Sequence, residues 1–105
     1  MSDFIELSSI EDIDTTGKTA LLFHIPGHCA GCKRVKDSLS KRPCDGWKIY
    51  LIDAENDNNK PLIEKYQVST APTIVLYNDE EMTGTIVGLK DFLQKADELF
   101  GALNL

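Results

Sequence analysis

Apolar residues in this chain gather in short runs separated by polar turns, a pattern typical of the strands of a β-sheet. Residues 19–25 are apolar at nearly every position, as expected for a strand that is covered on both faces. We therefore place this strand near the centre of the sheet. The other predicted strands are residues 4–7, 47–53, 73–77 and 83–87. The last two flank a polar turn, so they are expected to pair as an antiparallel hairpin.

Helix signals lie between these strands. Ser9 and Asp12 have the spacing of a capping box, so a first helix is expected to begin at Ser9. A second helix is expected to begin near Cys29 and to end at Pro43, because a proline interrupts helical hydrogen bonding. Its apolar positions at helical spacing are Cys32, Val35 and Leu39.

Two further helices are predicted in the second half of the chain. Pro61 follows a polar run and is suited to the first turn of a helix, where its missing N–H costs nothing. The last helix is predicted from apolar residues that recur at helical spacing. These are Leu89, Phe92, Leu93, Ala96, Leu99, Phe100 and Leu103. The order of elements requires crossovers between the early strands, so it predicts an α/β domain with a mixed sheet and helices on both faces.

Composition limits the size of the protein and its partners. With 105 residues, of which 42% are hydrophobic, residues 1–105 are expected to form a single domain with one core. The 17 acidic and 11 basic residues give a formal net charge of −6. Such a surface repels phosphate groups, so binding to nucleic acids or anionic membranes is not expected.

The ends of the chain and its cysteines suggest a compartment. The N-terminus has no basic region followed by an apolar stretch, and no apolar run is long enough to cross a bilayer. We therefore expect a cytoplasmic protein. Its three cysteines are too few, and odd in number, for a disulfide-stapled secreted scaffold. In a reducing compartment, a close cysteine pair is typical of catalysis or metal binding.

The motif with the most chemistry is Cys29-Ala30-Gly31-Cys32, which lies between the buried strand at residues 19–25 and the second predicted helix. Residues three apart are neighbours on a helix surface, so these two thiols are placed to form one reversible disulfide. A helix N-terminus has unpaired N–H groups and the positive end of the helix dipole, which favour a thiolate. The motif therefore predicts a redox site.

These residues, together with others along the chain, resemble the thioredoxin family over nearly the whole length. The matching features are Cys29-Ala30-Gly31-Cys32-Lys33, Asp53 at the end of a strand, Ala71-Pro72-Thr73 before the hairpin, and Val87-Gly88 before the last helix. The resemblance implies the thioredoxin fold, with a central mixed sheet of about five strands flanked by about four helices. It also implies that Pro72 is cis and lies against the CxxC pair.

The sequence departs from the family pattern at several positions. His28 stands where thioredoxins have tryptophan, and Ala30-Gly31 replaces their Gly-Pro. Counting back from the motif, Phe23 occupies the position of the buried aspartate that accepts the proton of the second cysteine. The lysine partner of that aspartate falls at Ile49, and Asp37 replaces the internal proline of the helix. The chain is therefore similar to a divergent family member whose proton route differs.

The resemblance and thiolate chemistry together predict a protein-disulfide reductase. Cys29 is expected to attack the substrate disulfide, and Cys32 then resolves the mixed disulfide. The proton of Cys32 could pass to His28, to His24 or to water, and the sequence does not distinguish these acceptors. The predicted substrate-binding residues are His28, Ala71, Pro72 and Gly88.

The resemblance further implies the partners of the protein. They are protein substrates that contain a disulfide, and a flavin-dependent thioredoxin reductase that uses NADPH to recycle the reduced form. No cofactor is expected to be bound by the chain itself, and a monomer is expected.

Several of these residues also have a purely structural interpretation. His28 could be an exposed residue that lines the substrate groove rather than one that stabilises the thiolate. His24 fits a hydrogen-bonded histidine of the core. Lys33 could be a solvated residue of the helix face, and Gly88 could simply separate a strand from a helix. Cys44 is interpreted as a spare thiol in a turn, with a regulatory or intermolecular disulfide as the alternative.

Two other functions stay open. The first is a redoxin coupled to glutathione, or one dedicated to ribonucleotide reductase, although Thr70-Ala71-Pro72 and the Ala-Gly dipeptide differ from the usual glutaredoxin pattern. The second is a zinc-binding module, because His24, His28, Cys29 and Cys32 offer nitrogen and sulfur ligands. Strand geometry argues against zinc, since His24 lies several residues from the helix end.

Overall fold

The strand that was expected at the centre of the sheet does lie there. The computed structural model describes residues 4–103 and contains one five-stranded sheet in the order β1-β3-β2-β4-β5. The strands are β1 (Phe4–Glu6), β2 (Lys18–His24), β3 (Trp47–Asp53), β4 (Thr73–Asn78) and β5 (Glu81–Val87). β1 and β2 both pair with β3 in parallel, β2 and β4 are antiparallel, and β4 and β5 form the predicted antiparallel hairpin.

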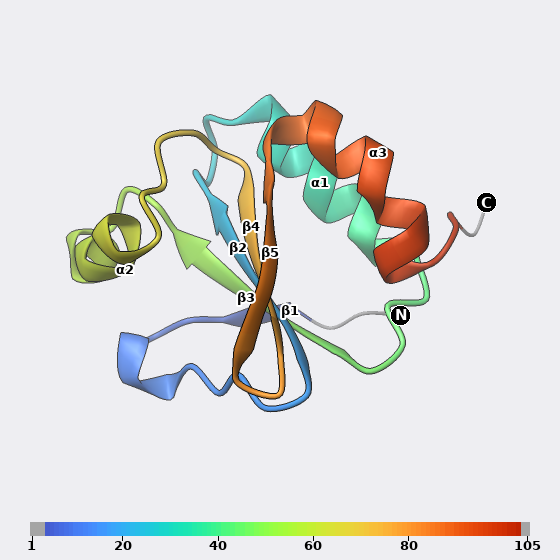
Figure 1. Ribbon diagram of the computed structural model, residues 1–105. Helices are drawn as coiled ribbons and strands as arrows, with labels where there is room; N and C mark the ends of the chain where they lie inside the picture. Colours follow the sequence, from blue (N-terminus) through green and yellow to red (C-terminus); the bar gives the residue numbers. More distant parts are fainter. Residues whose placement is uncertain (1–3, 104–105) are drawn as a thin grey trace.

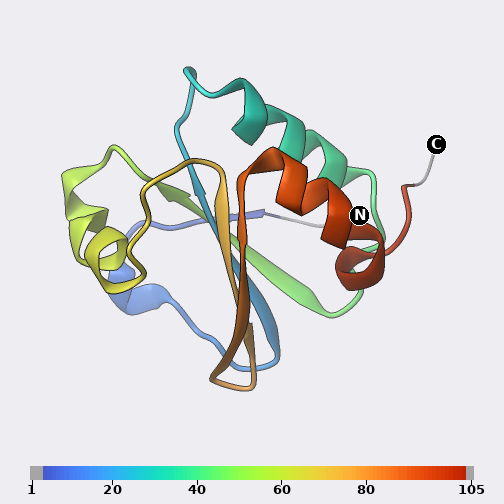
Figure 2. The same cartoon turned by 45° about the horizontal axis from the view of Figure 1, so that its top comes forward.

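The helices cover both faces of this sheet. They are α1 (Ala30–Ser40), α2 (Lys60–Lys65) and α3 (Gly88–Phe100). α1 and α3 lie side by side on one face, and α2 lies on the other (Figure 1, Figure 2). The mixed α/β sheet with helices on both faces is therefore confirmed. None of the helices within residues 4–103 combines the length and the apolar character needed to cross a bilayer.

Alternate residues of β2 contribute to two core clusters, one on each face of the sheet, where one core was expected. Leu22 packs with Val35 and Leu39 of α1 on one face of the sheet. Leu21 and Phe23 point to the opposite face, where their core includes residues of α2 and β3. This alternation follows from strand geometry, in which successive side chains point to opposite faces. It places even-numbered residues of β2 on the side of α1, which matters for the site described below.

The first predicted helix was wrong. Ile10–Asp12 forms only a short 3₁₀ turn, capped by the Ser9 side chain, which accepts a hydrogen bond from the N–H of Glu11. None of the three residues of this turn is buried, and a short helix without a packed apolar face is unstable. The domain consequently has three α-helices within the described residues, one fewer than expected.

The last helix is also shorter than its apolar pattern indicated. It ends at Phe100, because Gly101 has φ +90° and its N–H caps the carbonyl of Asp97. Leu103 thus lies outside the helix, and Leu93 is 50% exposed, so neither belongs to the buried face. α1 similarly ends at Ser40, before Pro43 is reached.

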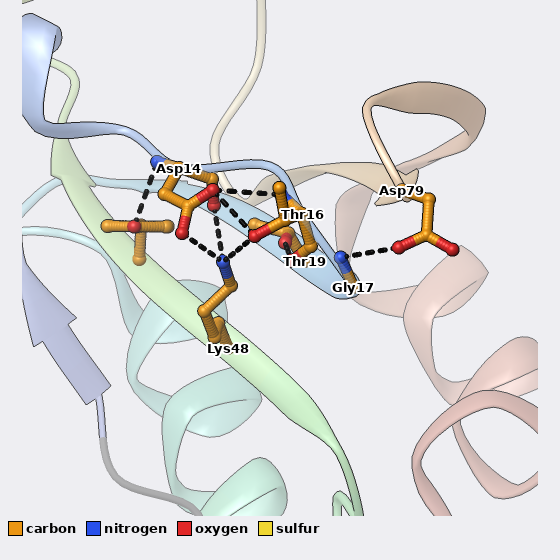
Figure 3. Close-up of polar contacts among 7 residues, drawn as sticks. Asp14, Thr16, Gly17, Thr19, Lys48 and Asp79 are labelled. Carbon is orange, nitrogen blue, oxygen red and sulfur yellow. Dashed lines mark hydrogen bonds and ion pairs between the residues drawn. The ribbon is translucent and has the colours of Figure 1, made fainter.

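A polar cluster holds together the turns at the end of the sheet where β2 begins. The carboxylate of Asp14 accepts hydrogen bonds from the Thr16 N–H at 3.0 Å and from its hydroxyl at 2.7 Å, and it forms an ion pair with Lys48 at 3.0 Å (Figure 3). These interactions lower the pKa of Asp14 to about 2, the hydrogen bonds from Thr16 being the largest cause. Asp79 of the hairpin turn accepts the N–H of Gly17 at 2.9 Å.

Candidate functional site

Cys29 and Cys32 lie where β2 passes into α1, as predicted. Cys29 is the N-cap residue of α1, with an extended backbone, and Cys32 is in the first turn. Their side chains are joined in a disulfide, with the two Cα atoms 5.2 Å apart, which is within the ordinary range for this bond. The CxxC pair is therefore a disulfide pair in this structure.

The two sulfurs have different environments. Cys29 is partly exposed, and its Sγ accepts a hydrogen bond from the backbone N–H of Cys32 at 3.1 Å. Cys32 is only 2% exposed. A hydrogen bond from the backbone and the positive end of the helix dipole both favour a negative charge on the sulfur of Cys29. Cys29 is thus the accessible sulfur with the better support for a thiolate.

Ala71 and Pro72 lie directly against the pair. Their peptide bond is cis, as the family resemblance implied. The Sγ of Cys29 lies 3.7 Å from the carbonyl oxygen of Ala71. Pro72 also lies close to Gly31, because a Cβ atom added to Gly31 would come within 3.3 Å of the Cδ of Pro72. The absence of a side chain at Gly31 therefore allows the proline ring to pack closely on the motif.

Gly88, the first residue of α3, is hydrogen-bonded to Pro72 beside the cysteine pair. Its N–H donates a hydrogen bond of 2.8 Å to the carbonyl of Pro72, and its φ of +85° is suited to glycine. His28 is exposed and precedes Cys29. The predicted substrate-binding residues His28, Ala71, Pro72 and Gly88 thus gather around Cys29, while their contact with a substrate stays a prediction.

A cavity of about 620 Å³ opens beside the disulfide, at the end of β2. Histidine and lysine side chains and both cysteines contribute to its wall, and none of the described residues that line it is acidic. The lining residues with polar or sulfur-containing side chains are His24, His28, Cys29, Cys32, Lys33 and Lys36. Lys36 of α1 is therefore part of the site.

His24 is the last residue of β2 and is 7% exposed. Burial is the main cause of the lowering of its pKa, and the positive charge of Lys36 acts in the same direction. The carboxylates of Asp53 and Glu6 oppose this effect. Asp53 lies beside His24 in the register of the parallel strands β2 and β3. The expected burial of His24 is confirmed, and the structure places it at the redox site.

Phe23 faces away from α1. Its ring packs against Tyr66 with the centroids 6.1 Å apart, within the core on the α2 side of the sheet. The residues of β2 on the α1 side are Ala20, Leu22 and, by strand alternation, His24. Phe23, which the resemblance places at the position of the aspartate, therefore lies on the opposite face of the sheet from α1. Leu22 is fully buried and apolar, so this face of β2 carries no carboxylic acid between Lys18 and His24.

Cys44 lies in the segment between α1 and β3, as predicted, and its side chain is buried. It follows α1 in a turn with φ +47°, but its side chain is 5% exposed and belongs to the core. Its thiol donates a hydrogen bond of 3.5 Å to the carbonyl of Leu39. Because the sulfur is covered, the structure does not favour the alternative of an intermolecular disulfide.

The zinc-binding alternative lacks a ligand cluster. Within residues 4–103, no group of three or more histidine, cysteine, aspartate or glutamate side chains could hold a metal ion. The sulfurs of Cys29 and Cys32 bond to each other.

Comparisons with known proteins agree with this geometry. The family model for thioredoxin matches residues 10–99. A thioredoxin from Streptomyces clavuligerus is 32% identical over 62 residues, which are 59% of this chain and 58% of that protein, so the match spans less than two thirds of this curated relative.

Solved structures of thioredoxins share the fold. A thioredoxin from Malassezia sympodialis superposes with a TM-score of 0.74 at 22% identity, covering 97% of this chain and 94% of that chain. The corresponding values for a thioredoxin from Trypanosoma brucei brucei are 0.75 and 22%, with 91% of this chain and 88% of that chain covered.

Proposed function

Because the chain belongs to the thioredoxin family, a family of thiol–disulfide oxidoreductases, we propose that it reduces disulfide bonds of other proteins through Cys29 and Cys32. One observation carries this proposal. Cys29 is partly exposed at the N-terminus of α1, accepts the N–H of Cys32, and lies 3.7 Å from the carbonyl of Ala71. An attacking thiol needs this combination of access and thiolate stabilisation.

The reaction consists of two thiol–disulfide exchanges. The thiolate of Cys29 attacks one sulfur of the substrate disulfide, the substrate S–S bond breaks, and its other sulfur leaves as a thiolate and takes up a proton. The thiolate of Cys32 then attacks the Sγ of Cys29 in the mixed disulfide and releases the second substrate thiolate. Two electrons pass to the substrate, which gains two thiols, and the Cys29–Cys32 disulfide forms.

The substrate is held by backbone contacts beside Cys29. Ala71 precedes β4 and offers its backbone to an extended substrate segment in the manner of strand addition. The N–H of Gly88 donates a hydrogen bond of 2.8 Å to the carbonyl of Pro72, which keeps both residues beside this segment. His28 is exposed next to Cys29 and lines the cavity beside the disulfide.

Recycling completes the proposal. The oxidised protein is reduced by a flavin-dependent thioredoxin reductase that draws on NADPH, and the protein acts as a monomer in the cytoplasm. The compartment is supported by the cysteine usage, because a reversible CxxC pair with few other cysteines suits a reducing environment.

One observation favours a second candidate, a redoxin coupled to glutathione. Lys33, Lys36 and two histidines line the cavity beside the disulfide, and no acidic side chain of the described chain joins them. A volume of about 620 Å³ is ample for a small ligand. The positive lining would attract a small anionic thiol such as glutathione.

Insulin reduction in the presence of NADPH and a thioredoxin reductase tests the first function. We expect turnover with the wild-type protein and none above background with Cys29→Ser. Absence of turnover in the wild-type protein would contradict the proposal. Turnover with glutathione and glutathione reductase, but not with thioredoxin reductase, would replace it by the second candidate. Activity restricted to ribonucleotide reductase would identify a dedicated redoxin.

A further inference from the structure

The resolving step requires an acceptor for the proton of Cys32. This thiol is 2% exposed, and burial in apolar surroundings raises the pKa of a thiol. The face of β2 that packs against α1 carries Ala20 and Leu22, both fully buried and apolar. A carboxylic acid is therefore not available from this part of the strand.

The next side chain on this face belongs to His24. Side chains alternate along β2, and Leu22 faces α1, so His24 faces the same side. Both His24 and Cys32 line the cavity at the start of α1. Solvent reaches His24 little, because only 7% of it is exposed. His24 and the buried Cys32 therefore border the same cavity.

The charges around His24 keep the imidazole ready to accept a proton. Burial and the positive charge of Lys36 in α1 lower its pKa, which favours the neutral imidazole. Asp53 of β3 and Glu6 of β1 act against this lowering and would stabilise the imidazolium once it has formed. Among the other residues of the cavity, Lys33 and His28 are exposed.

On the basis of the reductase function above, we propose that the imidazole of His24 accepts the proton of the Cys32 thiol in the resolving step. The S–H bond of Cys32 breaks, its proton passes to His24, and the sulfur keeps the electron pair. The resulting thiolate attacks the Sγ of Cys29 and displaces the substrate thiolate. When the disulfide is reduced again, Cys32 leaves as a thiolate and His24 returns the proton.

Release of a chromophoric thiol separates the two exchange steps. Reduced protein is mixed in a stopped-flow instrument with dithiobis(nitrobenzoate) at less than one reagent per protein. The first thionitrobenzoate is released when Cys29 attacks, and the second when Cys32 resolves the mixed disulfide. In the His24→Gln variant we expect an unchanged first phase. We expect a second phase at least about tenfold slower at pH 7, the lower end of what general base catalysis contributes. The slow phase should accelerate with pH up to the pKa of an unassisted buried thiol.

Three outcomes separate this inference from its alternatives. A second phase with unchanged rate and pH dependence in His24→Gln would overturn it. If the pH dependence instead changes in His28→Gln, then His28 is the acceptor and the inference is equally wrong. Lack of a first phase in the wild-type protein would contradict the proposed attack by Cys29, independently of His24.

A measurement on the wild-type protein does not depend on the folding of a variant. The imidazole of His24 is titrated by NMR in the disulfide and the dithiol states. Because interacting groups titrate together, we expect its midpoint to differ between these states, and the difference to vanish in reduced Cys32→Ser. The same midpoint in all three samples would overturn the inference.

Discussion

The backbone N–H of Cys32 donates a hydrogen bond of 3.1 Å to the Sγ of Cys29. This bond caps α1, because the sulfur takes the place that a serine or aspartate oxygen has at other helix N-termini. A sulfur that caps a helix is stabilised as a thiolate once the disulfide is reduced. The structure therefore distinguishes the two cysteines chemically, although the motif is nearly symmetric in sequence.

The first prediction is that Cys29 is the more acidic thiol. In the reduced protein, its pKa should lie below the ordinary value of about 8.5 for a free cysteine, whereas burial should raise that of Cys32. Alkylation by iodoacetamide as a function of pH, followed by peptide mass spectrometry, measures both. Faster alkylation of Cys32 than of Cys29 at pH 7 would contradict this assignment.

The second prediction concerns the contact between Gly31 and Pro72. In Gly31→Ala, the new Cβ would meet the Cδ of Pro72 at 3.3 Å, so the proline ring must move. We expect kcat/KM for insulin reduction to fall by on the order of tenfold, because small displacements of positioning groups cost reactivity. Gly84→Ala is the matched control, since a Cβ there meets no atom within 4 Å. An unaffected Gly31→Ala enzyme would show that the close packing of Pro72 is not needed.

The third prediction concerns the end of α3. Gly101 has φ +90° and ψ 162°, a region that is essentially restricted to glycine. A Cβ at this position would also come within 2.8 Å of Pro43. Gly101→Ala should lower the free energy of unfolding by on the order of 1–3 kcal/mol. Urea denaturation measures this loss, and equal stability of Gly101→Ala and Gly84→Ala would contradict it.

The fourth prediction concerns pH. The pKa of Asp14 is lowered from 3.8 to about 2 in the folded protein. Its carboxylate therefore stabilises the fold fully at pH values above 3.8. This stabilisation declines as the pH falls below 3.8 and is lost as the pH passes through the folded pKa of about 2. Asp14→Asn should therefore be less stable than the wild-type protein at pH 6, with a smaller difference at pH 2.

Urea unfolding at both values of pH provides the test, with Glu98→Gln of α3 as a control for loss of an exposed carboxylate. The control should have little effect at either pH. A stability difference for Asp14→Asn that is as large at pH 2 as at pH 6 would show that the carboxylate charge is not its cause.

The central strands and the redox motif could be predicted from the sequence because their signals are local and strong. Trp47–Asp53 was predicted with the same boundaries that the structure has, since β-branched and aromatic residues fill it. Cys29 was predicted at a helix start because a buried strand ends shortly before it. These features depend on patterns within one segment.

The features that were missed depend on contacts between segments. Ser9 has a capping signal, but nothing buries the turn that follows. Leu103 continues a helical pattern that Gly101 ends by its backbone conformation. The face of the sheet on which Phe23 lies was not predicted, and the structure places it on the α2 side. Cys44 lies in a turn that the core covers. Position in the sequence determines none of these environments.

Trapping of the mixed disulfide tests the attack by Cys29 most directly. Cys32→Ser and Cys29→Ser are each reduced and mixed with a peptide that contains a single disulfide, and the adducts are located by mass spectrometry. Attack by Cys29 predicts a stable adduct on Cys29 in Cys32→Ser and little or none in Cys29→Ser. An adduct that forms faster on Cys32 in Cys29→Ser would contradict it.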